Sequence, residues 1–261
     1  MTVCRTASLA DVGIDAVALK PTEVDISRAT DLDVDTVTID YEGREHLPAP
    51  ETLRNLADSV DLRVTAPVRA DGFDPLGDES RRAALPAGVS EVLVAGHGAY
   101  LDEHEQQRAV APRLEAAASD AVDPWIGTEG VERVALAVGG TQFELLSATT
   151  RRDIRALRAA GWEQPIAVYA PTVLTDDEDA ILDAVGAYAA RRGPVARALP
   201  EGAPTDATAE GRAREVLSSA VRDYALVGSV ESVRRQVEAL REAGADHVVA
   251  YPARGIGDFL V

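Results

Sequence analysis

Lys20 and His97 are two side chains of this sequence that could act as a nucleophile or as an acid–base group. Lys20 is the only lysine among 261 residues, and a buried lysine can form a Schiff base with a carbonyl substrate. His97 lies between two glycines in Gly96-His97-Gly98, where its imidazole could donate a hydrogen bond to a ligand. Each residue also has a plainer interpretation, because Lys20 could simply pair with a carboxylate and His97 could be incidental to a glycine turn. The sequence leaves these alternatives open.

A phosphate-bearing ligand is suggested by the pair Gly228-Ser229, which lies where a predicted strand gives way to a predicted helix. Ser229 can cap that helix, and the first free N–H groups of a helix can receive an anion. Arg254 follows the last predicted strand and supplies a local positive charge. In a (β/α)8 barrel, the loops after the seventh and eighth strands commonly build a phosphate site. These residues are therefore candidates for binding a cofactor phosphate.

A second glycine-containing segment is Gly139-Gly140-Thr141-Gln142, which we expect to follow the fifth strand. Its backbone N–H groups could approach a cofactor ring or phosphate. The alternative is that all these glycines belong to ordinary turns between strands and helices. The segment is a weak motif by itself and gains meaning only beside Gly228-Ser229 and Arg254.

Metal binding is not the preferred interpretation of the acidic clusters. Thr175 and Glu178 have the spacing of a capping box within Asp176-Asp177-Glu178-Asp179, and acidic residues suit the positive end of a helix. His104 lies among acidic residues that we interpret as an exposed helix start. The lone Cys4 excludes both an intramolecular disulfide and a zinc site of several thiolates. We therefore predict no metal.

Alternating strands and helices must position these residues. Strands are expected at 16–19, 36–40, 62–66, 92–95, 134–138, 166–169, 225–227 and 248–251, and helices at 50–59, 102–119, 150–160, 176–191, 209–223 and 230–243. Short crossovers are expected at 22–29 and 77–85. Eight such alternations predict a single (β/α)8 TIM barrel over residues 1–261. The segment 193–206, rich in proline and glycine, is expected to help cover a ligand.

Composition places the chain in a cellular setting. The formal net charge is −18, and 46% of residues are hydrophobic, which indicates a folded protein with an anionic surface. Abundant acidic residues with a single lysine predict a halophilic archaeal host, since concentrated salt screens the self-repulsion. Nucleic acid is an unexpected partner because no basic stripe is present. The absence of a signal peptide and of a long apolar run predicts a soluble cytoplasmic protein without a membrane association.

Two blocks of the sequence resemble a known superfamily. Leu226-Val-Gly-Ser-Val-Glu-Ser-Val233, with Leu240-Arg-Glu-Ala-Gly-Ala-Asp-His-Val-Val249, is similar to the C-terminal signature of bacterial-luciferase-like proteins. The segment Gln164–Glu178 resembles their sixth strand and the helix start that follows it. The superfamily includes flavin monooxygenases and deazaflavin-dependent oxidoreductases, among them methylenetetrahydromethanopterin reductases. The resemblance implies FMN or the deazaflavin coenzyme F420, with its phosphate near Gly228, Ser229 and Arg254.

The resemblance also implies ring contacts from Thr65, His97 and Gln142, a small-molecule substrate and a homodimer. The first function class is therefore an oxidoreductase for hydride transfer or monooxygenation, in which the cofactor supplies the reactive chemistry. The second is a cofactor-free barrel that acts as a binding or partner protein. This second class is favoured by the short chain and by segment 63–72, which lacks the glycine-rich turn common in the family. A lyase or isomerase that uses Lys20 or His97 is a third option.

Overall fold

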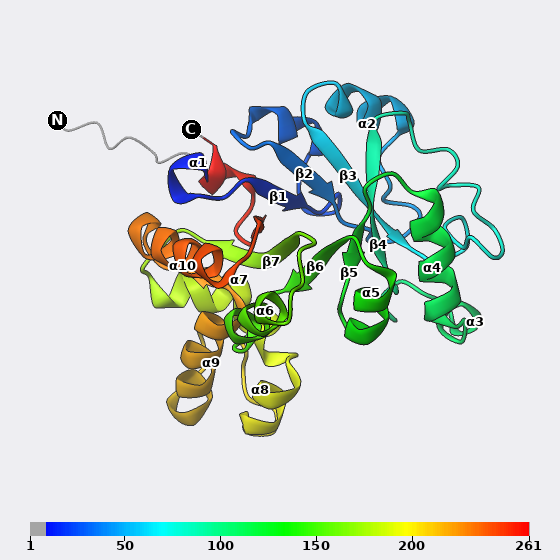
Figure 1. Cartoon of the computed structure of the whole chain (residues 1–261). Coiled ribbons are helices and arrows are strands. Elements are labelled where there is room, and N and C mark those ends of the chain that lie inside the picture. The colour runs from blue at the N-terminus through cyan, green and yellow to red at the C-terminus, as the bar shows by residue number, and fades with distance from the viewer. Residues whose placement is uncertain (1–8, 261) are drawn as a thin grey trace. The chain divides into compact units, whose positions relative to one another are not determined.

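Parallel strands alternate with helices along almost the whole chain, and the fold is a (β/α)8 TIM barrel, as the sequence predicts. The computed structural model describes residues 9–260 (Figure 1). Cys4 and the N-terminal residues for which we expect no signal peptide lie outside the described part. Within residues 9–260, every helix is too short or too polar to cross a bilayer.

The strands of the described chain are β1 (Ala16–Leu19), β2 (Thr36–Ile39), β3 (Asp61–Pro67), β4 (Val89–Val94), β5 (Trp125–Gly127), β6 (Thr141–Leu145), β7 (Ile166–Val173), β8 (Leu226–Val227) and β9 (His247–Pro252). The α-helices are α1 (Leu9–Val12), α2 (Pro50–Ala57), α3 (Glu103–Gln106), α4 (Val110–Asp120), α5 (Glu132–Val138), α6 (Thr150–Ala159), α7 (Glu178–Ala190), α8 (Gly193–Ala198), α9 (Gly211–Tyr224) and α10 (Val230–Ala243). Two 3₁₀ helices span Ile26–Asp31 and Ile256–Phe259.

The chain divides into two compact units. Unit 1 consists of residues 9–14, 145–162 and 168–260, and unit 2 consists of residues 15–144 and 163–167. The proposal of a single domain over residues 1–261 stays a prediction. Each unit is described by itself below.

Unit 2 contains the consecutive parallel strands β1 to β6. Because side chains alternate along a strand, one face of this sheet packs on helices, mostly through apolar side chains. Ala66 of β3 and Leu93 of β4 share a buried cluster with Leu114 and Ala117 of α4. The other face carries polar side chains, among them Thr38 and Arg63. Polar groups that could bind a ligand are therefore found on this face.

Unit 1 is built from β7, β8, β9 and the helices from α6 onward, together with α1 (Figure 1). The two residues of β8 pair in parallel with the last two residues of β7. An apolar cluster joins α7 to α9 through Leu182, Val185 and Leu217. The segment after α7, which includes α8, contributes Val195 to the same cluster. The excursion 193–206 therefore packs against α7 and α9.

The expected strand at 134–138 is wrong, because these residues lie in α5. A short apolar run does not distinguish a buried strand from a helix segment, and here Ala135 is buried while Arg133 is exposed. The fifth and sixth strands of the sheet are β5 and β6 instead. The three-residue β5 is shorter than the runs by which strands are recognised, and β6 coincides with the segment that we expected to be a glycine turn.

Smaller differences have local causes. The helix expected at 102–119 is two helices, α3 and α4, and Asp102 caps the first with a complete capping box. The crossover at 77–85 contains turns and no helix, while the crossover at 22–29 overlaps a 3₁₀ helix at Ile26–Asp31. The proline- and glycine-rich excursion contains the helix α8, because Pro194 near its start suits the first turn of a helix. The other strands and helices agree with the prediction to within a few residues.

Candidate functional site

Lys20 follows β1 and lies at the end of the strand where a barrel places its chemistry. Its Nζ lies 3.4 Å from Glu23 Oε1, and 26% of its side chain is exposed. Lys20 does pair with a carboxylate, while its role as a nucleophile stays a prediction. The loop that carries it is also tied to the loop after β2, because Glu42 accepts hydrogen bonds from the Thr22 N–H (3.0 Å) and hydroxyl (2.5 Å).

His97 belongs to an aromatic group after β2, β3 and β4. The ring of Tyr100 lies 6.2 Å from the His97 ring and 6.4 Å from Tyr41, which contacts Phe73 edge-on at 5.6 Å. Burial raises the pKa of the Tyr41 hydroxyl above its ordinary value. The backbone N–H of Ala99 donates to His97 Nδ1 at 3.1 Å. His97 is exposed, as is the Tyr100 ring beside it, so its imidazole can meet a small molecule.

Buried charges hold the loops after β3 and β4 in place. Glu105 accepts the N–H of Asp71 through Oε1 and the N–H of Asp102 through Oε2, both at 2.8 Å. Arg69 donates to the carbonyls of Ala95, Gly96 and Gln106, and burial lowers its pKa. The Arg69 guanidinium is engaged by these three carbonyls, so its role here is structural.

Thr65 lies within β3 and is partly exposed. By strand alternation it faces the same side of the sheet as Arg63. Arg63 is bound by Asp61 and Asp123, and its guanidinium carbon lies 4.5 Å above the Trp125 ring. The charged part of this face is therefore neutralised near the start of the strands. Thr65, two residues further along β3, remains available near the other end.

The segment Gly139-Gly140-Thr141-Gln142 does not follow a strand, and this part of the prediction is wrong. It ends α5 and begins β6, so it lies at the N-terminal end of a strand. An added Cβ on Gly140 would lie 3.1 Å from the carbonyl oxygen of Pro124, which immediately precedes β5. The two glycines have positive φ values of 86° and 71°, which explains their presence through the turn alone.

Gln142 is 2% exposed, and its side-chain amide bonds to backbone carbonyls of this turn. Its Nε2 donates to the carbonyls of Ala135, Gly139 and Gly140 at 3.3, 3.1 and 3.3 Å. These carbonyls belong to the end of α5 and the turn after it. Because a barrel presents its chemistry at the opposite ends of the strands, the turn does not place Gln142, Gly139 or Gly140 beside Thr65.

Gly228 and Ser229 connect β8 to α10, as the sequence predicts. Ser229 is the N-cap of α10, and its hydroxyl accepts the N–H of Ser232 at 3.4 Å. Gly228 has a φ of +126°, and an added Cβ would lie 2.9 Å from the Ser232 Cβ. The helix start itself therefore requires glycine at this position.

The N–H of Ser229 already has an anionic partner. It donates to Asp176 Oδ1 at 2.8 Å, although the two residues are 53 positions apart in the sequence. Asp176 is exposed and follows β7. Sequence reasoning misses Asp176 as a site residue, because the whole cluster 176–179 is interpreted as the start of a helix. Only Asp177 of this cluster caps α7, and no local signal distinguishes Asp176 from its acidic neighbours.

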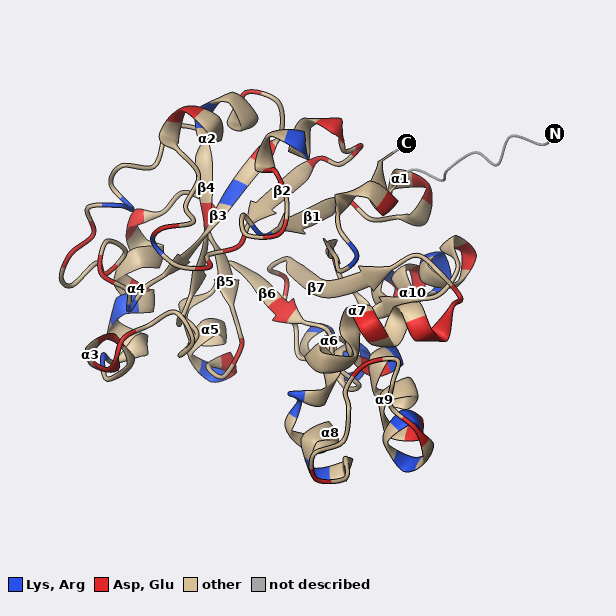
Figure 2. Cartoon of the chain, turned by 180° about the vertical axis from the view of Figure 1, so that it is seen from behind, with Lys and Arg blue, Asp and Glu red and all other residues tan. Residues whose placement is uncertain are grey.

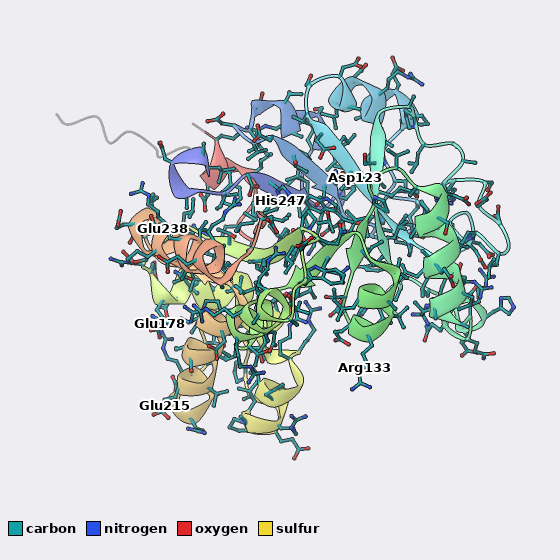
Figure 3. The ribbon with its side chains drawn as sticks, in the orientation of Figure 1. Asp123, Arg133, Glu178, Glu215, Glu238 and His247 are labelled. Atoms are coloured by element: carbon teal, nitrogen blue, oxygen red, sulfur yellow. The ribbon has the colours of Figure 1, made fainter. Side chains whose placement is uncertain are left out.

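The cap of α7 also differs from the prediction. Asp177, rather than Thr175, is the N-cap, and its carboxylate accepts the N–H groups of Asp179 and Ala180. Glu178 is directed to α9, where Arg214 Nε and the Ser218 hydroxyl donate to it (Figure 3). The predicted capping box of Thr175 and Glu178 is therefore wrong, because a closer carboxylate caps the helix and Glu178 has partners across the helix pair.

Arg254 follows β9, and 41% of its side chain is exposed. Its Nη1 lies 3.6 Å from Asp258 Oδ2, one turn further along the chain. In the same unit, the rings of Tyr169 in β7 and Tyr251 in β9 are nearly parallel, with centroids 6.3 Å apart. Arg254 is thus a surface cation near the ends of these strands, held by a single weak ion pair among the contacts described for it.

The predicted site residues fall into two groups. Lys20, Thr65 and His97 lie at or near C-terminal strand ends of unit 2, and Gly228, Ser229 and Arg254 lie at the corresponding ends in unit 1. Acidic residues occur on helices of both units (Figure 2). Among residues 9–260, no group of three or more histidine, cysteine or acidic side chains is arranged to hold a metal ion.

Comparison with known proteins assigns the family. Residues 9–259 match the model of a family of unknown function, DUF7388, and the chain belongs to that family. A search of curated proteins finds no match.

Solved structures share the fold. An F420-dependent secondary alcohol dehydrogenase, in complex with an F420–acetone adduct, superposes with a TM-score of 0.61 at 11% sequence identity, covering 95% of this chain and 96% of the other. The monooxygenase RslO1 from Streptomyces bottropensis superposes with a TM-score of 0.51 at 15% identity, covering 92% of each chain. The chain therefore shares its fold with these two proteins. At these identities the likeness concerns the fold alone.

Proposed function

We propose that this protein is a luciferase-like oxidoreductase that uses FMN or the deazaflavin F420 to transfer hydride to, or to monooxygenate, a small molecule. The observation that supports the proposal is the match of nearly the full chain to an F420-dependent dehydrogenase, at 95% and 96% coverage. A monooxygenase of similar fold adds support. Fold alone does not establish activity, so the site residues and a binding experiment must carry the rest.

The chain's own residues would position the ligand. Within unit 2, Thr65 and His97 would offer a hydroxyl and an imidazole. Within unit 1, Arg254 is a separate candidate, a surface cation that would bind an anionic group. The cofactor would supply the redox chemistry, as is general for such enzymes. Gly139, Gly140 and Gln142 are not retained, because their turn lies at the N-terminal end of β6 and Gln142 is committed to closing it.

The α10 N-terminus does not fit a cofactor phosphate in the described conformation. The Ser229 N–H that would receive it is bound to the Asp176 carboxylate at 2.8 Å, and two anions at one helix start repel each other. We therefore assign no phosphate to Gly228 and Ser229 in the proposed function. The titration with FMN and F420 described below identifies which residues bind a cofactor's phosphate.

The same contact favours a second candidate, a cofactor-free barrel that binds a partner or an uncharged small molecule. The Asp176 carboxylate takes the place of a ligand's anion and stabilises the start of α10 without any cofactor. Under this candidate the fold is retained while the redox role is lost.

The cellular setting is also part of the proposal. The charge of −18 and the single lysine support a cytoplasmic protein of a halophilic archaeon that acts on a small molecule, not on nucleic acid or a membrane. A homodimer and a single domain over residues 1–261 complete the proposal. Sedimentation in concentrated potassium chloride measures the oligomeric state directly.

Fluorescence titration with FMN and, separately, with F420 in concentrated potassium chloride tests the proposal. Saturable binding that Arg254→Ala weakens would support the oxidoreductase. Arg212→Ala is the matched control, because Arg212 also forms an exposed ion pair within one helical turn, with Glu215, but lies on α9. Failure of the folded protein to bind either cofactor would overturn the proposal and leave the cofactor-free barrel.

A further inference from the structure

The N–H group of Ser229 at the start of α10 has an anionic partner that the chain itself supplies. Asp176 Oδ1 accepts the Ser229 N–H at 2.8 Å, and α10 is a helix of 14 residues. An oxygen of a bound phosphate would use the same kind of contact. The Asp176 carboxylate therefore occupies the position that a phosphate oxygen would take at the Ser229 N–H.

The backbone holds the two loops together, so the contact does not depend on the Asp176 side chain alone. The N–H of Gly228 donates to the carbonyl of Val173, the last residue of β7, at 3.2 Å. Asp176 lies three residues beyond that carbonyl and Ser229 one residue beyond that N–H. An added Cβ on Gly228 would lie 3.5 Å from Asp176 Oδ1, so the carboxylate also lies against the glycine. The backbone pairing of the two loops therefore places the carboxylate beside Gly228 and Ser229.

The neighbouring charges oppose a second anion. Glu231 lies in the first turn of α10, and Asp177 caps α7 directly beside Asp176. Two nearby arginines are paired, since Arg234 binds Glu231 and Arg214 binds both Glu178 and Asp179. Arg235 approaches the helix start, where its Nη2 donates to the Ser232 hydroxyl at 3.2 Å. Arg234 and Arg214 are thus already engaged by other carboxylates, while Asp176 and Asp177 keep negative charge beside this helix start.

We infer that Asp176 excludes phosphate from the α10 N-terminus, so that the natural ligand of this barrel presents no phosphate to that helix. The inference says which class of ligand the proposed oxidoreductase would bind, namely one without a phosphate at α10. It rests on the proposed function only for the identity of that ligand. A flavin that lacks its phosphate, or another uncharged organic molecule, belongs to this class. FMN bound through its phosphate at Ser229 does not.

Inorganic phosphate is the first probe, since it requires no cofactor chemistry. The backbone amide of Ser229 is followed by ¹H–¹⁵N NMR during a phosphate titration at constant ionic strength, set with potassium chloride. In Asp176→Ala the Ser229 amide should shift saturably, with a dissociation constant lower than in the unmodified protein by about tenfold or more. In Asp176→Asn the change should be smaller, since the amide oxygen still accepts the Ser229 N–H.

Glu231→Gln is the control, because it removes one negative charge from the same helix end without touching the Ser229 N–H. If Glu231→Gln increases phosphate binding as much as Asp176→Ala does, bulk charge explains the effect and the inference is wrong. Saturable shifts of Ser229 in the unmodified protein, as tight as in Asp176→Ala, would also overturn it. The persistence of the α10 amide signals verifies that each variant is folded.

Riboflavin and FMN, which differ by one phosphate, separate this inference from the proposed function. If the unmodified protein binds riboflavin at least as tightly as FMN, and Asp176→Ala strengthens FMN alone, both proposals gain support. If neither flavin nor F420 binds but the phosphate titration behaves as expected, the oxidoreductase fails and the Asp176 inference stands. If FMN binds more tightly than riboflavin and its phosphate shifts Ser229 in the unmodified protein, the inference fails while the proposed function survives.

Discussion

Glu105 in unit 2 and Asp176 in unit 1 are carboxylates that accept backbone N–H groups from loops near the strand ends, yet their settings differ. Glu105 is 1% exposed and accepts two N–H groups, those of Asp71 and Asp102, beside Arg44 at 3.3 Å. Asp176 is exposed and accepts one, that of Ser229. The Glu105 carboxylate therefore joins two loops from a buried position, whereas the Asp176 carboxylate accepts an N–H at a helix start from an exposed one.

The difference teaches how burial decides the role of a charge. Removing a buried acceptor leaves its donors unsatisfied, and water cannot replace it without rearrangement. Removing an exposed acceptor opens its donor to water or to another anion at little cost in stability. We therefore expect changes at Glu105 to alter folding and changes at Asp176 to alter binding.

Glu105→Ala should produce the largest effect. It leaves the N–H groups of Asp71 and Asp102 without their acceptor and Arg44 without its partner. We expect a loss of about 3–5 kcal/mol in the free energy of unfolding, typical of breaking a buried charged contact. Urea unfolding followed by circular dichroism measures it. A loss no greater than that of an exposed carboxylate would show that the loops do not depend on Glu105.

Asp74→Ala tests whether the same rule holds for a second buried carboxylate in unit 2. The Asp74 side chain is 2% exposed and contacts Arg113 Nε at 2.8 Å and Arg108 Nη1 at 3.3 Å. The loss should be about 2–3 kcal/mol, smaller than at Glu105 because Arg108 keeps its contact with Asp71. Glu79→Ala is the control, since this exposed partner of Arg82 should change stability by about 0.5 kcal/mol or less.

Asp102, which accepts the N–H of Glu105, makes the stability of this region depend on pH. Its hydrogen bond from the Glu105 N–H lowers its pKa below the ordinary value of 3.8. A carboxyl whose pKa is lower in the folded state stabilises the fold above its unfolded pKa, and that contribution is lost as pH falls through the folded value. Asp102→Asn should therefore flatten the decline in stability below about pH 4. Unfolding curves of both proteins across this range measure the effect, and an unchanged decline would contradict it.

Asp176→Ala should produce the smallest effect on stability. An exposed carboxylate with a single N–H partner should change the free energy of unfolding by about 0.5 kcal/mol or less. Thermal unfolding beside Glu105→Ala makes the comparison directly. A loss as large as that of Glu105→Ala would abolish the contrast between the two carboxylates and assign Asp176 a purely structural role.

Local sequence signals predicted much of the fold. The helix at 230–243 and the strand at 16–19 are confirmed to the residue, because their apolar spacing and flanking glycines act over short distances. The run 134–138 was misassigned, since five apolar residues suit a buried strand and a short helix equally. That error moved Gly139, Gly140 and Gln142 to the wrong end of a strand, and the carbonyls that engage Gln142 could not be foreseen from its type.

The sequence by itself determined the barrel class, the anionic surface and the Ser229 cap, because each depends on composition or on residues a few positions apart. The tertiary structure alone decided which residue accepts the N–H of Ser229, the cap of α10. Asp176 and Ser229 are 53 positions apart, and their contact exists because the pairing of β7 with β8 brings the two following loops together. Helix capping is a local interaction that periodicity and residue type reveal, whereas the occupant of a helix start depends on which distant loop the sheet places beside it.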